Sequence, residues 1–504
     1  MNILHVYPKI PEETFWSLKK ALNFVGKKAA LPPLPLLTVA GILREIKPDW
    51  NQKLVDLNVE KLPEADLEWA DQVFVSAMII QEQSVREVID RCHKHDNVKI
   101  VAGGPLFTSQ ESETEGVDHF ILGEAEITLP LFVRDLEAGQ AKHRYETDQK
   151  PDLSQTPPPD WSLLAPKFKQ YSAMSVQYSR GCPHKCEFCD IRVMFGQKPR
   201  VKEISQFIHE LDLLYDAGYR GSVFVVDDNF IGNKSKVKQM LPPLKDWLSQ
   251  RNYPFKFMTE ASIVLASDHE LMEAMSEANF YKVFLGLETP SKDALKECNK
   301  GQNVNVDLVE AVHQIQTHGM MVMSGHIVGF DTDDESIFER QIEFIQRIGV
   351  AMAMVGLLAV LPKTDLEKRL REEKRLLKKT TGENSNTLTF IPKMDKDVLI
   401  NGYYQLLNTI YAPREYYKRI DVFLKEYRPT VKRRLNLADW SSNIRALLLG
   451  SVRIGFSRHG YYYWRLLLKT LVTKPAAFTE AVELAICGVH FRSVTRRIVS
   501  SSHV

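Results

Sequence analysis

The chain has 504 residues, more than one ordinary hydrophobic core accommodates, so two to four domains are expected. Its 44% hydrophobic and 26% charged residues and its net charge of +1 exclude a disordered or uniformly charged chain. No apolar run approaches the roughly 20 residues of a membrane span, and the first residues lack a basic leader, so a cytoplasmic protein is expected.

The first 140 residues alternate between strand and helix patterns. Short apolar runs predict strands at residues 3–7, 53–57, 72–77, 98–102 and 119–122, with helical periodicity between them. Strands separated by helices form a parallel, doubly wound, Rossmann-like sheet, and ligands bind beyond the carboxyl ends of its strands. The residues at those ends are Pro8, Asp56, Met78, Gly103, Gly104, Gly123 and Glu124.

A second alternating region follows a break. Residues 141–170 are polar and contain three consecutive prolines, which predicts an extended linker. Six strands with helical segments between them are then expected in residues 171–370, which indicates a (β/α)6 partial TIM barrel with its chemistry at the carboxyl ends of the strands. The expected strands cover residues 173–178, 222–226, 255–260, 282–287, 321–328 and 353–360.

The remaining residues, 371–504, have a mostly helical pattern and a basic end. Residues 428–504 hold thirteen Lys and Arg against three Asp and Glu, so their charge is +10 and the rest of the chain carries −9. We favour a helical cap with a solvated basic face. The aromatic and cationic residues 461–465 and Lys469 also suit a membrane interface, so peripheral membrane contact remains an alternative. No base-reading motif accompanies the charge, so no nucleic-acid partner is expected.

Three of the six cysteines lie close together. Cys182, Cys186 and Cys189 have the spacing C-x₃-C-x₂-C, with no fourth cysteine nearby. A structural zinc site needs four protein ligands, and His184 lies inside the first gap, where reaching the same metal is awkward. Three thiolates suit a [4Fe–4S] cluster that leaves one iron open for a substrate.

This segment resembles the cysteine motif of the radical S-adenosylmethionine (SAM) superfamily. The resemblance implies that SAM chelates the open iron, and that an electron from a donor such as flavodoxin or ferredoxin cleaves SAM to a 5′-deoxyadenosyl radical. Three later segments resemble family motifs: residues 286–289 (G-[IL]-E-[ST]), 325–329 (G-x-I-x-G) and 361–364 (L-P-x-T). The implied SAM contacts are Phe188, Asp228, Glu260, Ser262, Glu288, Gly325 and Gly329. For Glu260 and Glu288, a structural barrel carboxylate is the alternative.

The amino-terminal region resembles the cobalamin-binding class of radical SAM enzymes, in the subgroup with a carboxyl-terminal helical extension. The resemblance rests on Gly103-Gly104-Pro105 and on Gly123-Glu124-Ala125-Glu126. It implies that the seven strand-end residues named above contact cobalamin. The chain lacks D-x-H-x-x-G, whose histidine ligates cobalt in other cobalamin domains, so the residue under the cobalt is expected near Met78 or Ile79. The alternative is that the domain has lost cobalamin.

The resemblance implies methylation of an unactivated carbon in a small-molecule or lipid substrate. One alternative uses the same cofactors for oxidation, cyclisation or rearrangement. Another is a nucleotide-binding sensor with a structural cluster.

Overall fold

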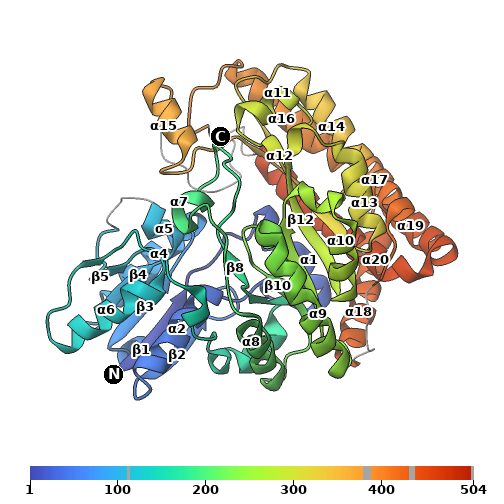
Figure 1. The fold of residues 1–504 in the computed structure, drawn as a ribbon. Helices are drawn as coiled ribbons and strands as arrows, with labels where there is room; N and C mark the ends of the chain where they lie inside the picture. The colour runs from blue at the N-terminus through green and yellow to red at the C-terminus, as the bar shows by residue number, and fades with distance from the viewer. Residues whose placement is uncertain (110–113, 378–387, 431–436, 501–504) are drawn as a thin grey trace.

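The computed structural model describes residues 1–109, 114–377, 388–430 and 437–500. Two parallel sheets and a group of carboxyl-terminal helices make up the molecule (Figure 1). Along the chain, the second sheet follows the first. In space, the helices of the last hundred residues pack on the side of the second sheet that faces away from the first sheet.

The first sheet has six parallel strands in the order β2-β1-β3-β4-β5-β6. The order reverses direction between β1 and β3, so the crevice for a ligand lies at the carboxyl ends of these two strands. The strands are β1 (Asn2–Tyr7), β2 (Asn51–Asp56), β3 (Gln72–Ser76), β4 (Lys99–Gly103), β5 (His119–Ile121) and β6 (Arg144–Tyr145).

Alternate residues of these strands pack into two separate cores, because successive side chains point to opposite faces. Ile3 packs with α2 (Leu34–Ile46) and α6 (Ala125–Glu137). Leu4 packs on the opposite face, which is covered by α3 (Glu64–Trp69), α4 (Glu82–Cys92) and α5 (Pro105–Ser109). The predicted doubly wound domain is confirmed.

The strand β6 lies within residues 141–170, which the sequence predicts as a linker. Phe120 N donates to His143 O at 2.7 Å and Leu122 N donates to Tyr145 O at 2.9 Å, so the start of residues 141–170 extends the first sheet. The strand is two residues long and Tyr145 is its one buried residue, which leaves no periodic apolar signal in the sequence. Short 3₁₀ turns follow at Leu153–Gln155, Trp161–Leu163 and Ala165–Gln170.

The second sheet also has six parallel strands, in the order β14-β13-β12-β11-β10-β7. Each strand neighbours the next along the chain, and β7 and β14 are the two edges, as in the predicted (β/α)6 partial barrel. The strands are β7 (Ala173–Val176), β10 (Gly221–Val225), β11 (Phe255–Ala261), β12 (Phe280–Glu288), β13 (Met321–Val328) and β14 (Ala353–Leu357). The helices between them are α8 (Ile204–Asp216), α9 (Lys234–Gln250), α10 (His269–Glu277), α11 (Lys292–Glu297), α12 (Gly301–Val304), α13 (Leu308–Thr317) and α14 (Ile337–Arg347).

The barrel strands separate a buried side from a half-exposed side. Along β11, buried residues alternate with the half-exposed Lys256, Met258 and Glu260. Phe284 on β12 and Ile327 on β13 are half-exposed in the same way. Because the outer helices cover the buried side, these half-exposed residues line the barrel interior.

The carboxyl-terminal helices attach both to the barrel and to the start of the chain. α16 and α17 pack on α14, and α20 packs on α16 to α19 and on α1 (Lys19–Val25). The Phe15 ring, in the 3₁₀ turn Phe15–Ser17, stacks on Phe491 with centroids 5.5 Å apart. The helices are α15 (Asp365–Glu372), α16 (Lys396–Ile410), α17 (Pro413–Glu426), α18 (Leu437–Gly450), the π-helical turn Ser451–Gly455, α19 (Gly460–Thr473) and α20 (Phe478–Ser500).

Candidate active site

The three clustered cysteines lie on one loop, which we call the cluster loop, residues 181–190. It connects the short strand β8 (Ser179–Arg180), paired with β9 (Arg200–Val201), to α7 (Ile191–Phe195). Cys182, Cys186 and Cys189 are half-buried free thiols. Burial raises the pKa of Cys189 to about 12, and the neighbouring Cys186 and Cys182 add to this rise.

The donor set fits an iron–sulfur cluster. Three thiols near enough to influence one another's ionisation supply three of the four cysteine positions of a [4Fe–4S] cube. Within the described part of the chain, no three His, Cys, Asp or Glu side chains converge as a single metal ion requires. In a [4Fe–4S] cluster, by contrast, each cysteine thiolate binds a different iron atom, so the three sulfurs need not converge on one point.

Two amides contact the cysteine sulfurs. Asn229 Nδ2 lies 3.8 Å from Cys182 Sγ, and Gln302 Nε2 lies 3.8 Å from Cys186 Sγ. Asn229 Oδ1 also accepts from Ser262 N at 3.1 Å, which links β11 to the cluster loop. Neither amide was predicted as a site residue. Asn229 directly follows Asp227 and Asp228, which is a weak local signal, whereas Gln302 comes from α12 and has no signal in its own segment.

Two carboxylates after β10, the buried Asp227 and the half-buried Asp228, fix the start of the cluster loop. Asp228 Oδ2 accepts from Gly181 N at 2.9 Å, and Asp227 accepts from Tyr178 N and from Ser179 Oγ. Burial raises the pKa of Asp228 to about 6. Asp228 was predicted to contact SAM, and the structure gives it a backbone partner in the loop itself.

Glu260 and Ser262, at the carboxyl end of β11, fit a cationic, polar ligand. Glu260 faces the barrel interior, and burial raises its pKa to about 8, with a smaller contribution from Asp228. A cationic group beside Glu260, such as the amino group of SAM, would stabilise its ionised form. Ser262 Oγ is buried and has no hydrogen-bond partner among the described residues, which leaves it available for a bound molecule.

The end of β12 carries a strained carboxylate that is paired with a lysine. Glu288 has φ +62°, a left-handed conformation that is rare for a residue with a side chain. Its Oε1 pairs with Lys300 Nζ at 2.5 Å, and Lys300 Nζ lies 5.9 Å from the centroid of the Phe188 ring. The sequence predicted Glu288 and Phe188 but not Lys300, whose position depends on the turn after α11.

Three glycines lie on or directly after β12 and β13, near the carboxyl ends of these strands. Gly325 on β13 lies in register with Gly286 on β12, and both are half-exposed on the interior side. Gly329 has φ +100°, and its N–H donates to Asp333 Oδ2 at 2.9 Å. A Cβ on Gly286 would lie 2.5 Å from Glu288 Oε1, and one on Gly325 would lie 3.1 Å from the Phe284 ring, so these glycines make room for side chains of the site.

The predicted cobalamin residues fall into two groups. Pro8, Met78 and Gly104 lie together at the ends of β1, β3 and β4: Gln81 bonds both Pro8 O and Met78 N, and a Cβ on Gly104 would lie 2.7 Å from Ser76 Oγ. Met78 is 40% exposed, which is unusual for a large apolar side chain at a strand end. A Cβ on Gly103 would lie 2.7 Å from Ile121 O, so this glycine serves strand packing.

The residues of the second group include Asp56 and Glu124, whose side chains form hydrogen bonds or ion pairs with other residues of the protein. Asp56 is buried and accepts from Tyr171 OH at 2.9 Å. The Glu124 side chain is 2% exposed and pairs with Arg180 at 2.8 Å and with Arg200 at 2.7 Å. Gly123, before it, has φ +75°, and a Cβ on it would lie 3.6 Å from Thr147 O. Asp56 and Glu124 therefore connect the first sheet to the barrel, and Glu124 holds the residue that precedes the cluster loop.

A matching contact holds the other end of the cluster loop. Arg369 in α15 bonds Glu187 with Nε–Oε1 at 2.6 Å and pairs with Asp331 at 2.8 Å. Leu366 N donates to Glu187 O at 3.0 Å. The barrel, including α15, thus contacts the cluster loop, and the first sheet holds the residue directly before it.

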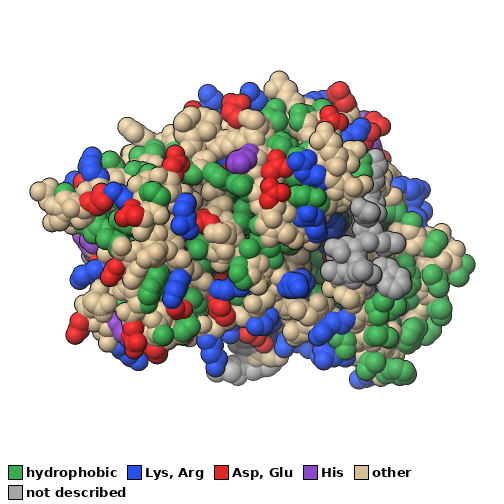
Figure 2. All heavy atoms as spheres, turned by 90° about the horizontal axis from the view of Figure 1, so that it is seen from below, with side chains coloured by type: hydrophobic (Ala, Val, Ile, Leu, Met, Phe, Trp, Pro, Cys, Tyr) green, Lys and Arg blue, Asp and Glu red, His purple; other side chains and the backbone are tan. Residues whose placement is uncertain are grey.

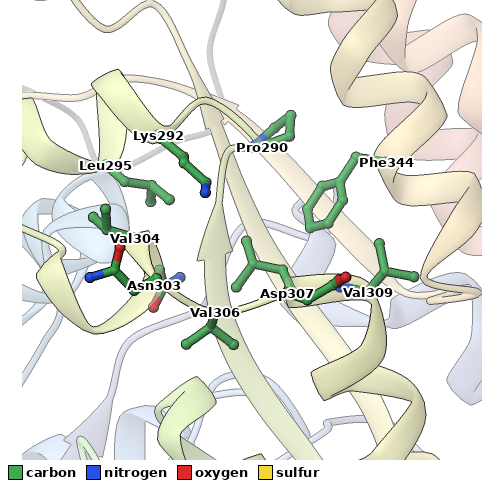
Figure 3. A pocket seen from close by; sticks show the side chains of 11 residues that line it. Pro290, Lys292, Leu295, Asn303, Val304, Val306, Asp307, Val309 and Phe344 are labelled. Carbon is green, nitrogen blue, oxygen red and sulfur yellow. The ribbon is translucent and has the colours of Figure 1, made fainter.

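A separate cavity of about 450 Å³ lies next to the segment that follows β12. Figure 3 shows the side chains that line it. Asn303, Asp307 and the Phe344 ring of α14 are among its lining residues. None of the predicted cluster, SAM or cobalamin residues lines it, so we distinguish it from the site between the two sheets.

Comparisons with known proteins agree with this architecture. Residues 28–133 match the B12 binding domain, residues 176–387 match the radical SAM superfamily, and residues 364–503 match a domain of unknown function (DUF4070). An uncharacterized methyltransferase, sll1242, of Synechocystis sp. is 41% identical over 97% of this chain and 91% of its own length. The hopanoid C-2 methylase of Rhodopseudomonas palustris is 31% identical over 94% of this chain and 89% of its own.

Two solved structures share the fold. The cobalamin-dependent SAM radical enzyme OxsB, with aqua-cobalamin and SAM bound, has a TM-score of 0.65 at 14% identity and covers 100% of this chain and 80% of its own. The radical SAM methyltransferase TsrM of Kitasatospora setae has a TM-score of 0.64 at 12% identity and covers 100% of both chains.

The fold and the site define a radical SAM enzyme with a cobalamin-binding domain. The chain belongs to the cobalamin-dependent radical SAM family, in which it is a C-methyltransferase. Its cofactors are a [4Fe–4S] cluster, SAM and cobalamin. The predicted family, fold class and cofactors are confirmed.

Proposed function

We propose that this enzyme methylates an unactivated carbon of an apolar lipid of the hopanoid kind. The observation that carries the proposal is the contact of Glu124 with Arg180, which ties the carboxyl edge of the cobalamin-binding sheet to the residue before the cluster loop. Both cofactors then face one space, where a substrate carbon can meet each of them. The hopanoid C-2 methylase, similar along nearly the whole chain, supports the substrate class.

The lining of the barrel interior supports an apolar substrate. Phe284, Met258 and Ile327 are half-exposed there. The Trp16 ring, from the amino-terminal segment, lies 5.0 Å from the Phe284 ring and is 46% exposed. Exposed aromatic surface beside a catalytic site is typical of apolar ligand recognition. We assign Trp16 and Phe284 to substrate binding.

We assign the remaining predicted residues as follows. Cys182, Cys186 and Cys189 hold the cluster. Phe188, Glu260, Ser262, Glu288 with Lys300, and the backbone at Gly325 and Gly329 hold SAM, while Asp228 positions the cluster loop. Pro8, Met78, Gly104 and Gly123 would contact cobalamin, and Met78 or Ile79 would lie nearest to its cobalt. When bound, the cluster supplies the electron that cleaves SAM, and cobalamin supplies the methyl group.

Three further assignments complete the proposal. The electron comes from a small donor such as flavodoxin or ferredoxin, and the enzyme works in the cytoplasm. The cobalamin-binding domain covers residues 1–140 together with β6, the linker ends at residue 170, the barrel covers residues 171–370 and the extension covers residues 371–504.

Anaerobic reconstitution with iron, sulfide and cobalamin tests the function. With a strong reductant, SAM and a hopanoid, we expect 5′-deoxyadenosine, S-adenosylhomocysteine and a product heavier by one methyl group. The alanine variants of the three cysteines should give none of these. 5′-Deoxyadenosine with an oxidised or cyclised product, and no S-adenosylhomocysteine, would contradict methyl transfer. A cluster that never cleaves SAM would contradict the whole assignment.

A further inference from the structure

The helical hairpin of α18, the π-helical turn and α19 exposes an unusual amount of apolar surface. Sixteen large hydrophobic side chains are exposed in the described parts of the chain, and nine of them lie between residues 444 and 472. Contiguous apolar surface on a protein marks a site of interaction, whereas single exposed hydrophobic residues are ordinary.

The helix α19 is apolar on two opposite faces. Tyr463, Leu466 and Leu467 are buried, on the side packed against α17 and α20. The outer face carries Trp464 (38% exposed), Leu468 (62%) and Val472 (81%), which are spaced four residues apart and so form one stripe. An amphipathic surface helix would carry polar residues at these positions.

The rest of the hairpin continues this surface. Leu448 and Val452 are each 61% exposed and lie one helical turn apart, and Phe456 in the turn is 82% exposed. Trp464 Nε1 donates to Gly455 O at 3.2 Å, which joins α19 to the turn. In Figure 2, hydrophobic side chains gather at the end of the molecule where Figure 1 places α18 and α19.

The charge of the hairpin indicates what covers this face. Residues 444–474 contain six Lys and Arg and no Asp or Glu. Arg445, Arg453 and Arg458 are exposed beside the apolar residues. A second copy of the chain would bring an equally basic face against this one, which is unfavourable in a two-fold interface. An anionic lipid surface offers both opposite charge and an apolar layer.

We propose that the outer face of this hairpin docks on an anionic membrane surface, with its apolar and aromatic side chains inserted to the depth of the headgroups. No helix within residues 1–109, 114–377, 388–430 and 437–500 is long and apolar enough to cross a bilayer, so the contact is interfacial. The proposal stands independently of the proposed substrate, although docking would bring the enzyme to a lipid that resides in the membrane.

Flotation of the full-length, reconstituted enzyme with vesicles tests the proposal. We expect the enzyme to bind vesicles of phosphatidylcholine with phosphatidylglycerol, and to bind pure phosphatidylcholine more weakly. The double variant Leu468→Glu/Val472→Glu should lower binding by about tenfold or more, because two apolar contacts are replaced by charges that the anionic surface repels. The matched control is Leu131→Glu on α6, another exposed apolar position (40%), which should bind like the wild type.

A second measurement reports insertion directly. Brominated lipids should quench the fluorescence of the wild type, and Trp464→Phe should lose most of this quenching. Absence of binding to anionic vesicles, or binding that the double variant leaves unchanged, would overturn the proposal. The proposal would also be overturned if the wild type failed to bind vesicles and instead formed a dimer that dissociates in the double variant. Methylation of a detergent-dispersed substrate by the double variant should equal that of the wild type, so failure of docking is distinguishable from failure of the proposed function.

Discussion

Arg180 and Glu124 form a buried ion pair between the cobalamin-binding domain and β8, the strand that directly precedes the cluster loop. Arg180 Nη1 lies 2.8 Å from Glu124 Oε2, and its Nη2 lies 2.8 Å from Glu126 Oε1. The Arg180 side chain is 10% exposed and that of Glu124 is 2% exposed. Because Arg180 comes two residues before Cys182, this pair sets the position of one cofactor site relative to the other.

Arg180→Ala should destabilise the protein strongly, because it leaves two buried carboxylates without this partner. Removing one member of a buried ion pair typically costs about 3–5 kcal/mol. Arg180→Lys should recover only part of the loss, because lysine keeps the charge but cannot bond two carboxylates with a planar fork. Urea unfolding of the apoprotein measures both effects.

Arg134→Ala is the control for this prediction. Arg134 pairs with Asp135 at 2.8 Å, but its side chain is 69% exposed, so its loss should cost less than about 1 kcal/mol. Equal destabilisation by Arg180→Ala and Arg134→Ala would contradict a positioning role for Arg180.

The same pair illustrates what the sequence could and could not predict. Both sheets were predictable, because their strands are apolar runs at regular spacing, and the cysteine spacing alone indicated the cluster. Glu124 was predicted to contact cobalamin because it follows a strand end of the first sheet. Its partners Arg180 and Arg200 lie more than fifty residues away, and a contact at that separation leaves no local pattern. Lys300 and Gln302 were missed for a related reason, since the fold of the α11–α12 turn decides their positions.

Gln302→Leu should lower the reduction potential of the cluster. The N–H group of Gln302 points at Cys186 Sγ at 3.8 Å, and donors to the cysteine sulfurs stabilise the reduced, more negative cluster. An EPR-monitored redox titration measures the potential. Gln314→Leu on α13, where the amide bonds Glu310 at 3.3 Å, is the control and should leave the potential unchanged. A potential equal to that of the wild type in Gln302→Leu would refute the contribution of this amide.

Met78→His should place an imidazole under the cobalt. Met78 is 40% exposed at the carboxyl end of β3, beside the point where the strand order reverses. A histidine nitrogen bound to Co(II) splits each cobalt EPR line into three, because the nitrogen nucleus has spin one. Leu131→His, at an equally exposed position on α6, should give the spectrum of the wild type. Unsplit lines in Met78→His, with cobalamin retained, would place Met78 away from the cobalt.

Trp16→Ala should weaken substrate binding and leave the cleavage of SAM intact. The exposed indole beside Phe284 offers apolar surface to the substrate, and losing such a contact should lower kcat/KM for methylation by about 10- to 100-fold. Formation of 5′-deoxyadenosine without substrate should remain as in the wild type. Ile391→Ala, which truncates another exposed apolar residue (48%), controls for general effects. A parallel loss of both products in Trp16→Ala would indicate a structural role instead.

Asp56 should make the stability of the protein depend on pH. Burial raises the pKa of Asp56 to about 6, although hydrogen bonds from Asn58 and Tyr171 act in the opposite direction. A carboxyl whose pKa is higher in the folded state than in the unfolded state binds its proton more tightly when folded. Its contribution is therefore fully present below the ordinary aspartate pKa of 3.8 and is lost as the pH rises through about 6. The gap between these two values corresponds to about 3 kcal/mol.

Asp56→Asn should remove this dependence, because the amide is neutral at every pH. Its oxygen can still accept from Asn58, and its NH2 group can donate to the hydroxyl oxygen of Tyr171. Urea unfolding between about pH 4 and pH 7 should show the free energy of unfolding falling for the wild type and staying flatter for the variant. At neutral pH the variant should then be the more stable protein. Asp118→Asn, at a more exposed carboxylate that pairs with Lys99 at 3.0 Å, is the control and should keep the slope of the wild type. If Asp56→Asn has that slope as well, Asp56 is ionised in the folded protein at no cost, and its contact with Tyr171 is an ordinary charged hydrogen bond between the first sheet and the barrel.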